Sequence, residues 1–425
     1  MVQVRAHTKH CRTLRINFND RRRLWVLQEV VLASSNTCYW GNFEFDLLDA
    51  VRAAAWLNHK VKFITPGLYS CFGWHCAYEM FDLLDRDNGR FPDDRNLSKI
   101  LGTARRFEKT EARDSIYAIL GLIDQDRALS GDEAALLTVD YTRPLPDVLR
   151  DATRYALCEH NNLQALSRNN HQVDMSADSQ NFPTWTVRAD LLRQSQDAPS
   201  FSFFHYTDEG LEAPSLLSDI SFGKNTLLLQ GIAVDQVVQT SSVCDESFWE
   251  EDEGYHQWLV SVKDMIIHHP DIAMQENVDL AIASTLVAGH ARSGGAAQPD
   301  DLKFLAEYIK GLAVREDGVD ADGVSIRPHF DEEDMHTVRL SHSVYYSANR
   351  RFFVTAAGRT GIGPRCMQPE DIVVVLRGGH LPIILRKKAD GYWLIGEAYV
   401  HGIMHGEAVQ MHKSRGGSEV VFHVR

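Results

Sequence analysis

The sequence predicts an α+β protein in which a helix-rich N-terminal and middle region precedes a β-rich C-terminal subdomain. Up to residue 314, apolar residues recur mainly at helical spacing. From residue 343 onward, short β-prone runs alternate with glycines, which is typical of a small antiparallel sheet or barrel. The run 225–239, NTLLLQGIAVDQVVQ, has a similar alternation, and we expect it to join that sheet.

The first strong element is the segment 21–33, RRRLWVLQEVVLA, which predicts a helix with Asp20 as its N-cap. Most of its positions are apolar, so we expect most of this helix to be buried. Its single acid, Glu29, must then find a hydrogen-bonding partner, raise its pKa or face a pocket. Trp25 precedes Glu29 by one helical turn.

The remaining elements follow from the same periodicities. Residues 1–19 are polar and basic and show no clear period. Another helix begins near Arg113 and Asp114 and is expected to end at Gly121 as a left-handed cap. An extended piece is expected at 139–141 and a tight loop at 396–406. Further helices are expected at 43–57, 67–85, 97–107, 144–160, 248–269, 274–289 and 302–314, and strands at 37–40, 352–355, 371–376, 382–385 and 392–395.

Composition bounds the class of protein. A chain of 425 residues with 44% apolar residues has ample length for more than one domain. We place the boundaries at 1–125, 126–335 and 336–425. The net charge of -14 argues against binding to nucleic acid or an anionic membrane surface, and no apolar run is long enough to span a bilayer. Seven scattered cysteines suit a reducing cytoplasm.

Two groups of residues invite a metal-site hypothesis. Cys71, His75 and Cys76 lie close in sequence, but two further ligands at short spacing are missing. His401 and His405 are four residues apart, but the glycines beside them disfavour a regular helix. We therefore predict packing and turn roles for these residues, with no metal and no cofactor.

Arg113 and Asp114 place a cation beside a carboxylate at the edge of an apolar segment. Two interpretations follow. The pair forms an ion-pair latch, or it forms a site for an anionic ligand. We favour the latch.

A family resemblance starts from Arg23, Trp25, Gln28 and Glu29. This pattern resembles a signature block of the fungal heterokaryon-incompatibility (HET) domain, which reads roughly arginine-x-Trp-x-x-Gln-Glu. Similar blocks follow at 110–122, 139–141, 182–185, 350–376 and 396–409. Positions that match the family's motifs are Arg23, Gln28, Arg113, Asp114, Tyr117, Asp140, Tyr141, Trp185, Glu397, Tyr399 and His401.

The resemblance carries structural expectations. Residues 1–125 correspond to the C-terminal part of a HET domain, because the Tyr-x-Trp-Gly-like strand and the signature helix that normally come earlier are not recognisable. A truncated gene model and a natural variant would both give this pattern. Trp185 is expected to anchor its loop in the core. Glu397, Tyr399 and His401 are expected to satisfy backbone groups in a structural turn.

The resemblance also implies a role in fungal nonself recognition, with protein partners of unknown identity and cell death as the outcome. HET domains resemble TIR domains, so Glu29 would stabilise the ribosyl cation as nicotinamide leaves NAD, and Trp25 would line the nicotinamide subsite. The alternative pairs Glu29 with Arg22, Arg23 or Arg113 and leaves the protein catalytically silent. We favour the silent protein; an accessory role beside a secondary-metabolite gene cluster is a third hypothesis.

Overall fold

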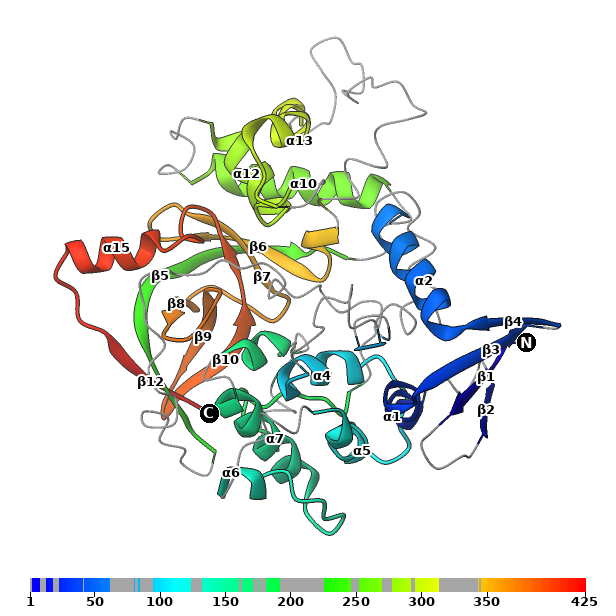
Figure 1. Ribbon diagram of the computed structural model, residues 1–425. Helices are drawn as coiled ribbons and strands as arrows, with labels where there is room; N and C mark the ends of the chain where they lie inside the picture. Colours follow the sequence, from blue (N-terminus) through cyan, green and yellow to red (C-terminus); the bar gives the residue numbers. More distant parts are fainter. Residues whose placement is uncertain are drawn as a thin grey trace. The chain divides into compact units, whose positions relative to one another are not determined.

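The computed structural model in Figure 1 is α+β, as predicted, and its C-terminal region is rich in strands. It consists of two compact units, the first formed by Met1–Asn161 and Thr186–Ser195 and the second by Asn162–Trp185 and Gln196–Arg425. The described residues are 2–7, 13–17, 23–40, 42–61, 80, 83–84, 95–123, 132–159, 163–169, 171, 175, 181–191, 225–245, 252–269, 277–291, 295–312, 343 and 345–425.

The first unit contains a four-stranded antiparallel sheet in the order β2-β1-β3-β4. Its strands are β1 (Val2–His7), β2 (Thr13–Asn17), β3 (Ser35–Trp40) and β4 (Phe43–Asp46). Strands β1 and β2 lie in the segment where the sequence showed no clear period. Strand β1 also pairs with β3, which is distant in sequence, and a period within one segment does not record such a pairing. The predicted helix 43–57 begins later than expected, since Phe43–Asp46 alternates as a strand.

Helix α1 (Leu24–Leu32) is shorter than the predicted 21–33. Arg23, not Asp20, occupies the N-cap position, where its extended backbone forms a bridge to Glu108. The N–H of Leu24 donates to the carbonyl of Glu108 at 2.9 Å, so tertiary pairing sets the helix start. Five of the nine residues are buried, as expected for this apolar segment: Leu24, Val26, Leu27, Val30 and Val31.

The other helices of the first unit include two errors of prediction. The segment after Asp114 forms only a short helix and then a 3₁₀ turn, so Gly121 is not a left-handed cap. The segment 139–141 leads into a turn, in which the N–H of Arg143 donates to the carbonyl of Asp140. The predicted helix 67–85 lies almost entirely outside the described residues. The helices are α2 (Leu47–Val61), α4 (Leu97–Ala104), α5 (Asp114–Tyr117), η3 (Leu120–Leu122), α6 (Asp132–Ala135) and α7 (Leu145–Glu159).

The second unit is built on the long strand β5 (Leu227–Val243), which includes most of the segment expected to join the C-terminal sheet. It pairs in succession with β12 (Val420–Val424), β8 (Ile372–Leu376) and β6 (Arg350–Thr355). Gly231 pairs with both β12 and β8, and a Cβ there would lie 2.3 Å from the carbonyl oxygen of Val375. A side chain at this crossing would therefore separate the strands.

The strand order is β11-β7-β6-β5-β12-β10-β9-β8, with β8 returning to β5, so five of these strands close into a barrel. The loop predicted at 396–406 instead contains the end of β10 and the short β11, and a helix follows it. The remaining elements are β7 (Thr360–Pro364), β9 (Ile383–Lys388), β10 (Gly391–Glu397), β11 (Tyr399–Val400), η5 (Gln164–Arg168), α10 (Asp252–Ile267), α12 (Val278–Leu286), α13 (Pro299–Gly311) and α15 (Glu407–Ser414).

Two apolar cores organise the second unit. One joins strands β5, β6, β8, β9 and β10 to α15, with Phe353, Ile384 and Val409 among its members. The other joins α10, α12 and α13 to strands β6 and β7. Within the described part of the chain, no helix is long and apolar enough to cross a membrane.

Candidate functional sites

The motif at α1 is held in place by two contacts within the first unit. The guanidinium of Arg23 donates to the hydroxyl of Thr110 at 3.0 Å. Gln28 packs over Gly121, where a Cβ would lie 2.0 Å from the Gln28 amide nitrogen. The motif glutamine and the glycine of the following block are therefore fitted to each other.

The environment of Glu29 differs from that of the motif residues Arg23 and Gln28. It is half-buried, and its Oε2 is inaccessible to solvent with no hydrogen-bond partner among the described residues. Burial raises the pKa of this carboxyl. Of its expected partners, Arg22 lies outside the described residues, whereas Arg23 contacts Thr110 and Arg113 contacts Glu111. Trp25, one turn earlier, is 42% exposed.

The second and third motif blocks meet at α5. Tyr141 donates its hydroxyl to Asp114 Oδ1 at 2.6 Å, and Tyr117 donates to the carbonyl of Asp140 at 3.0 Å. The two tyrosine rings contact edge to face, with centroids 5.1 Å apart. The hydrogen bond to Asp114 raises the pKa of Tyr141 to about 12. These contacts join the loop 138–143 to α5.

Arg113 and Asp114 do not pair with each other. The guanidinium of Arg113 donates to Glu111 Oε1 at 2.6 Å and to the carbonyl of Arg143 at 2.8 Å. Asp114 instead accepts from Tyr141. The prediction of an ion pair between Arg113 and Asp114 is therefore wrong, and each residue instead makes a separate contact with the loop 138–143.

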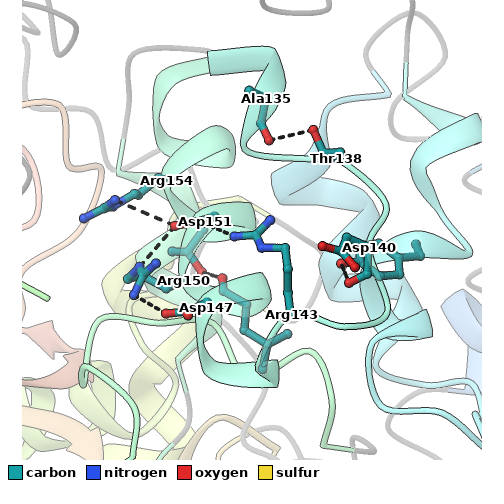
Figure 2. Close-up of polar contacts among 11 residues, drawn as sticks. Ala135, Thr138, Asp140, Arg143, Asp147, Arg150, Asp151 and Arg154 are labelled. Atoms are coloured by element: carbon teal, nitrogen blue, oxygen red, sulfur yellow. Dashed lines mark hydrogen bonds and ion pairs between the residues drawn. The ribbon is translucent and has the colours of Figure 1, made fainter. Parts of the chain in front are cut away.

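Arg143 is a contributor that sequence reasoning missed. Figure 2 shows its side chain reaching Asp151 on α7, where Arg150 and Arg154 also converge. The Nε of Arg150 lies 3.1 Å from Asp151, which is 6% exposed. Charges at helical spacing along α7 were a readable signal, since Asp151 and Arg154 are three residues apart. Through Arg143, this Asp151 cluster gives the loop 138–143 a contact with α7 in addition to its hydrogen bonds with α5.

In the second unit, Trp185 is fully buried. Its indole N–H donates to the carbonyl of Asn225 at 3.2 Å, and its own carbonyl accepts from Asn169 at 3.1 Å. The neighbouring Thr184 donates to the carbonyl of Arg425 and accepts from the N–H of Leu394. The motif therefore fixes this loop to the barrel strands.

The last motif block lies at β10 and β11 and uses side-chain partners, where backbone partners were expected. Glu397 forms a buried ion pair with Arg350, 3.1 Å apart. Tyr399 meets the hydroxyl of Ser284 at 3.1 Å and Nδ1 of His401 at 3.4 Å. Burial raises the pKa of Tyr399 to about 12 and lowers the pKa of His401.

Metal binding finds no support in the described residues, where no group of three or more His, Cys, Asp or Glu side chains is placed to hold an ion. Cys71, His75 and Cys76 lie outside them. His405 is exposed, and its backbone N–H donates to Oε2 of Glu407 at 2.7 Å. Chemically, the motif residues mostly join one part of a unit to another, and Glu29 alone offers a desolvated acid beside an accessible aromatic ring.

The comparisons with known proteins agree with this architecture. Residues 300–416, which include β6 to β11 and the whole of α15, match the family described as the Het-6 beta-barrel domain. The second unit therefore contains a segment similar to a domain of heterokaryon-incompatibility proteins, and the match covers a limited part of the chain.

One protein with a similar sequence is heterokaryon incompatibility protein 6, OR allele, of Neurospora crassa. It is 40% identical to this chain over 81 residues, which is 17% of the chain and 12% of the relative. The match thus spans about an eighth of that protein. No solved structure matches the chain.

Proposed function

We propose that this protein acts in fungal nonself recognition as a non-catalytic, protein-binding member of the heterokaryon-incompatibility type. One observation carries the proposal: the motif side chains bind other parts of their own unit. Arg23, Arg113 and Tyr141 all use their polar groups in this way. A catalytic site needs polar groups that remain directed at a substrate.

The proposed partners are proteins in the cytoplasm, and the proposed outcome of recognition is cell death. The net charge of -14 disfavours nucleic acid as a partner. The loop 138–143 is a surface suited to protein contact, because its two ties leave Val139 and Tyr141 more than half exposed. Rigid aromatic side chains are frequent anchors of protein interfaces.

A second candidate function is cleavage of NAD by Glu29. The observation that favours it is the buried Oε2 atom without a hydrogen-bond partner among the described residues. A partly desolvated carboxylate interacts strongly with the positive charge that develops as a glycosidic bond to nicotinamide breaks. Trp25 lies one turn away and is accessible to a ligand ring.

Nicotinamide release separates the two candidates. Purified protein is incubated with NAD beside Glu29→Gln and a matched control, Asp49→Asn, which removes an exposed acid from α2 of the same unit. The proposal predicts no release from any of the three proteins. Release that Glu29→Gln abolishes and Asp49→Asn retains would overturn it and establish the enzyme.

Expression in a fungal host tests the biological role separately from the chemistry. We expect loss of viability with both the unchanged protein and Glu29→Gln, because binding does not need the carboxylate. Val139→Asp combined with Tyr141→Asp should restore growth, since it places charge on the proposed contact surface. Loss of viability that depends on Glu29 but not on this surface would contradict the proposal.

A further inference from the structure

Lys109 lies in the segment that links α4 to α5, beside the start of helix α1. The carbonyl of its neighbour Glu108 accepts from the N–H of Leu24 at 2.9 Å, so this segment sets where α1 begins. The ammonium of Lys109 donates to the carbonyl of Ala189 at 2.7 Å. Ala189 belongs to the loop 186–190, a later part of the chain within the same unit. Lys109 therefore joins this loop to the segment that supports α1.

The charged groups around Lys109 leave it without a carboxylate of its own. Asp190 is its acidic neighbour, but both oxygens of Asp190 accept from the guanidinium of Arg188, at 2.8 Å each. Within the described part of the chain, Lys109 forms no ion pair, and the carbonyl of Ala189 is its one hydrogen-bond partner. Arg105, which is buried, adds a second positive charge nearby. A partly buried ammonium in such a place is unfavourable.

This environment favours the uncharged amine. Burial lowers the pKa of Lys109 to about 8, with the charge of Asp190 opposing the shift and that of Arg105 adding to it. At pH 7 about one such amine in ten is uncharged, compared with about one in 2,500 for an ordinary lysine of pKa about 10.4. Because only the uncharged amine has a free electron pair, a desolvated lysine beside another cation is an activated nucleophile.

We propose that Lys109 is an acylation site, at which the amine attacks an acyl thioester. The electron pair of Nζ adds to the thioester carbonyl carbon, so that a C–N bond forms and the C–S bond breaks. The sulfur leaves with a proton from the amine, as a thiol. The product is an uncharged amide, and the buried positive charge is thereby removed. Lysine is a common target of such modification in proteins.

Lys263 on α10 of the second unit provides a comparison within the same chain. Burial lowers its pKa as well. Its ammonium, however, donates to three carbonyls at the end of α13, at 2.8 to 2.9 Å: those of Ile309, Lys310 and Leu312. Three acceptors engage all three N–H groups of the ammonium and stabilise its charged form. We therefore expect Lys263 to react more slowly than Lys109, which has one such acceptor among the described residues.

Acylation should loosen the contact between Lys109 and the loop 186–190. An amide N–H is a weaker donor than an ammonium, and the acyl group needs space beside the carbonyl of Ala189. A second contact of the loop would remain, because the N–H of Val187 donates to the hydroxyl of Thr153 on α7 at 3.0 Å. The expected change is therefore confined to the part of the loop near Ala189.

Acetylation of the unchanged full chain by acetyl-coenzyme A tests the reactivity. Mass spectrometry of peptides gives the rate at Lys109, at Lys263 and at Lys303, which is exposed on α13. At pH 7, Lys109 should react at least about tenfold faster than Lys303, and the ratio should fall as pH rises toward about 10, where an ordinary lysine also loses its proton. Equal rates at pH 7, or a ratio that pH does not change, would overturn the proposal.

Asp190→Asn tests the electrostatic cause. It removes the acid beside Lys109, so the rate at pH 7 should rise about threefold. Asp49→Asn, at an exposed position of α2, is the matched control and should leave the rate unchanged. A rate that Asp190→Asn leaves unchanged or lowers would contradict this cause.

Hydrogen–deuterium exchange tests the structural consequence. The loop 186–190 should exchange faster in the acetylated protein and in Lys109→Gln, which removes the charge, than in the unmodified protein and in Lys109→Arg, which keeps the charge. The acetylated protein gives this answer even if a variant fails to fold. Exchange of the loop that acetylation leaves unchanged would show that Lys109 does not hold it.

Discussion

The two units use their motif residues differently. In the second unit, Glu397 and Arg350 are each only 3% exposed and form an ion pair inside the fold. In the first unit, Tyr141 is 53% exposed, although its hydroxyl is hydrogen-bonded to Asp114. The difference indicates that the motif residue Glu397 stabilises the second unit, whereas the motif residue Tyr141 gives a surface loop of the first unit its shape.

The largest expected effect on stability comes from breaking the ion pair of the second unit. Glu397→Gln removes one charge of the buried pair and leaves Arg350 desolvated, which should lower the free energy of unfolding by about 3–5 kcal/mol. Urea denaturation of the purified protein measures the change. The double variant Arg350→Met with Glu397→Met should recover most of the loss, since it buries no charge. A loss below about 1 kcal/mol in Glu397→Gln would contradict a structural role for this motif.

A smaller loss of stability is expected in the first unit, when the contact between Arg143 and Asp151 is removed. Arg143→Met keeps the aliphatic stem but removes the bond to Asp151, and should cost about 1–3 kcal/mol. The loop 138–143 should then exchange its amide hydrogens faster, while the barrel strands stay protected. Hydrogen–deuterium exchange detected by mass spectrometry checks this. Arg415→Met, at an exposed position, is the control. Unchanged protection of the loop would show that the Asp151 cluster does not hold it.

The smallest effect concerns Glu29 and its pH dependence. Its pKa is raised, so the folded state binds the proton more readily than the unfolded state, and the stability that Glu29 contributes falls as pH rises above the ordinary value of 4.5. Glu29→Gln should therefore be more stable than the unchanged protein at about pH 7, by less than about 1 kcal/mol because the residue is only half-buried. The difference should vanish near pH 4.

Thermal unfolding at the two pH values measures this change. Lower stability of Glu29→Gln at neutral pH would mean that the carboxylate is paired, and would remove the observation that favours cleavage of NAD. Glu29 would then resemble Glu397 of the second unit, which has a buried ion-pair partner.

Several elements could be predicted from the sequence because their signal is local. The apolar run around Val30 gives α1, and the amphipathic spacing of Val148 and Tyr155 gives α7. The β-prone run that contains Val374 gives β8. Each of these segments carries its own periodicity, which survives in the fold because burial follows the same pattern.

Other features could not be predicted because they depend on partners distant in sequence. The strand Val2–His7 forms because β3 pairs with it. The glycine requirement at Gly121 comes from Gln28, and the position of the loop 138–143 depends on Arg143 reaching Asp151. Residue types at these positions carry no local signal of the contact.

The sequence by itself determined the α+β class, the apolar helix around Glu29, the β-rich C-terminal region and the resemblance to heterokaryon-incompatibility proteins. Only the tertiary structure decided what each motif residue contacts and that Glu29 lacks the arginine partners at positions 23 and 113. The physical reason is that periodicity records burial along one segment, whereas hydrogen bonds, ion pairs and sheet edges are properties of two segments brought together.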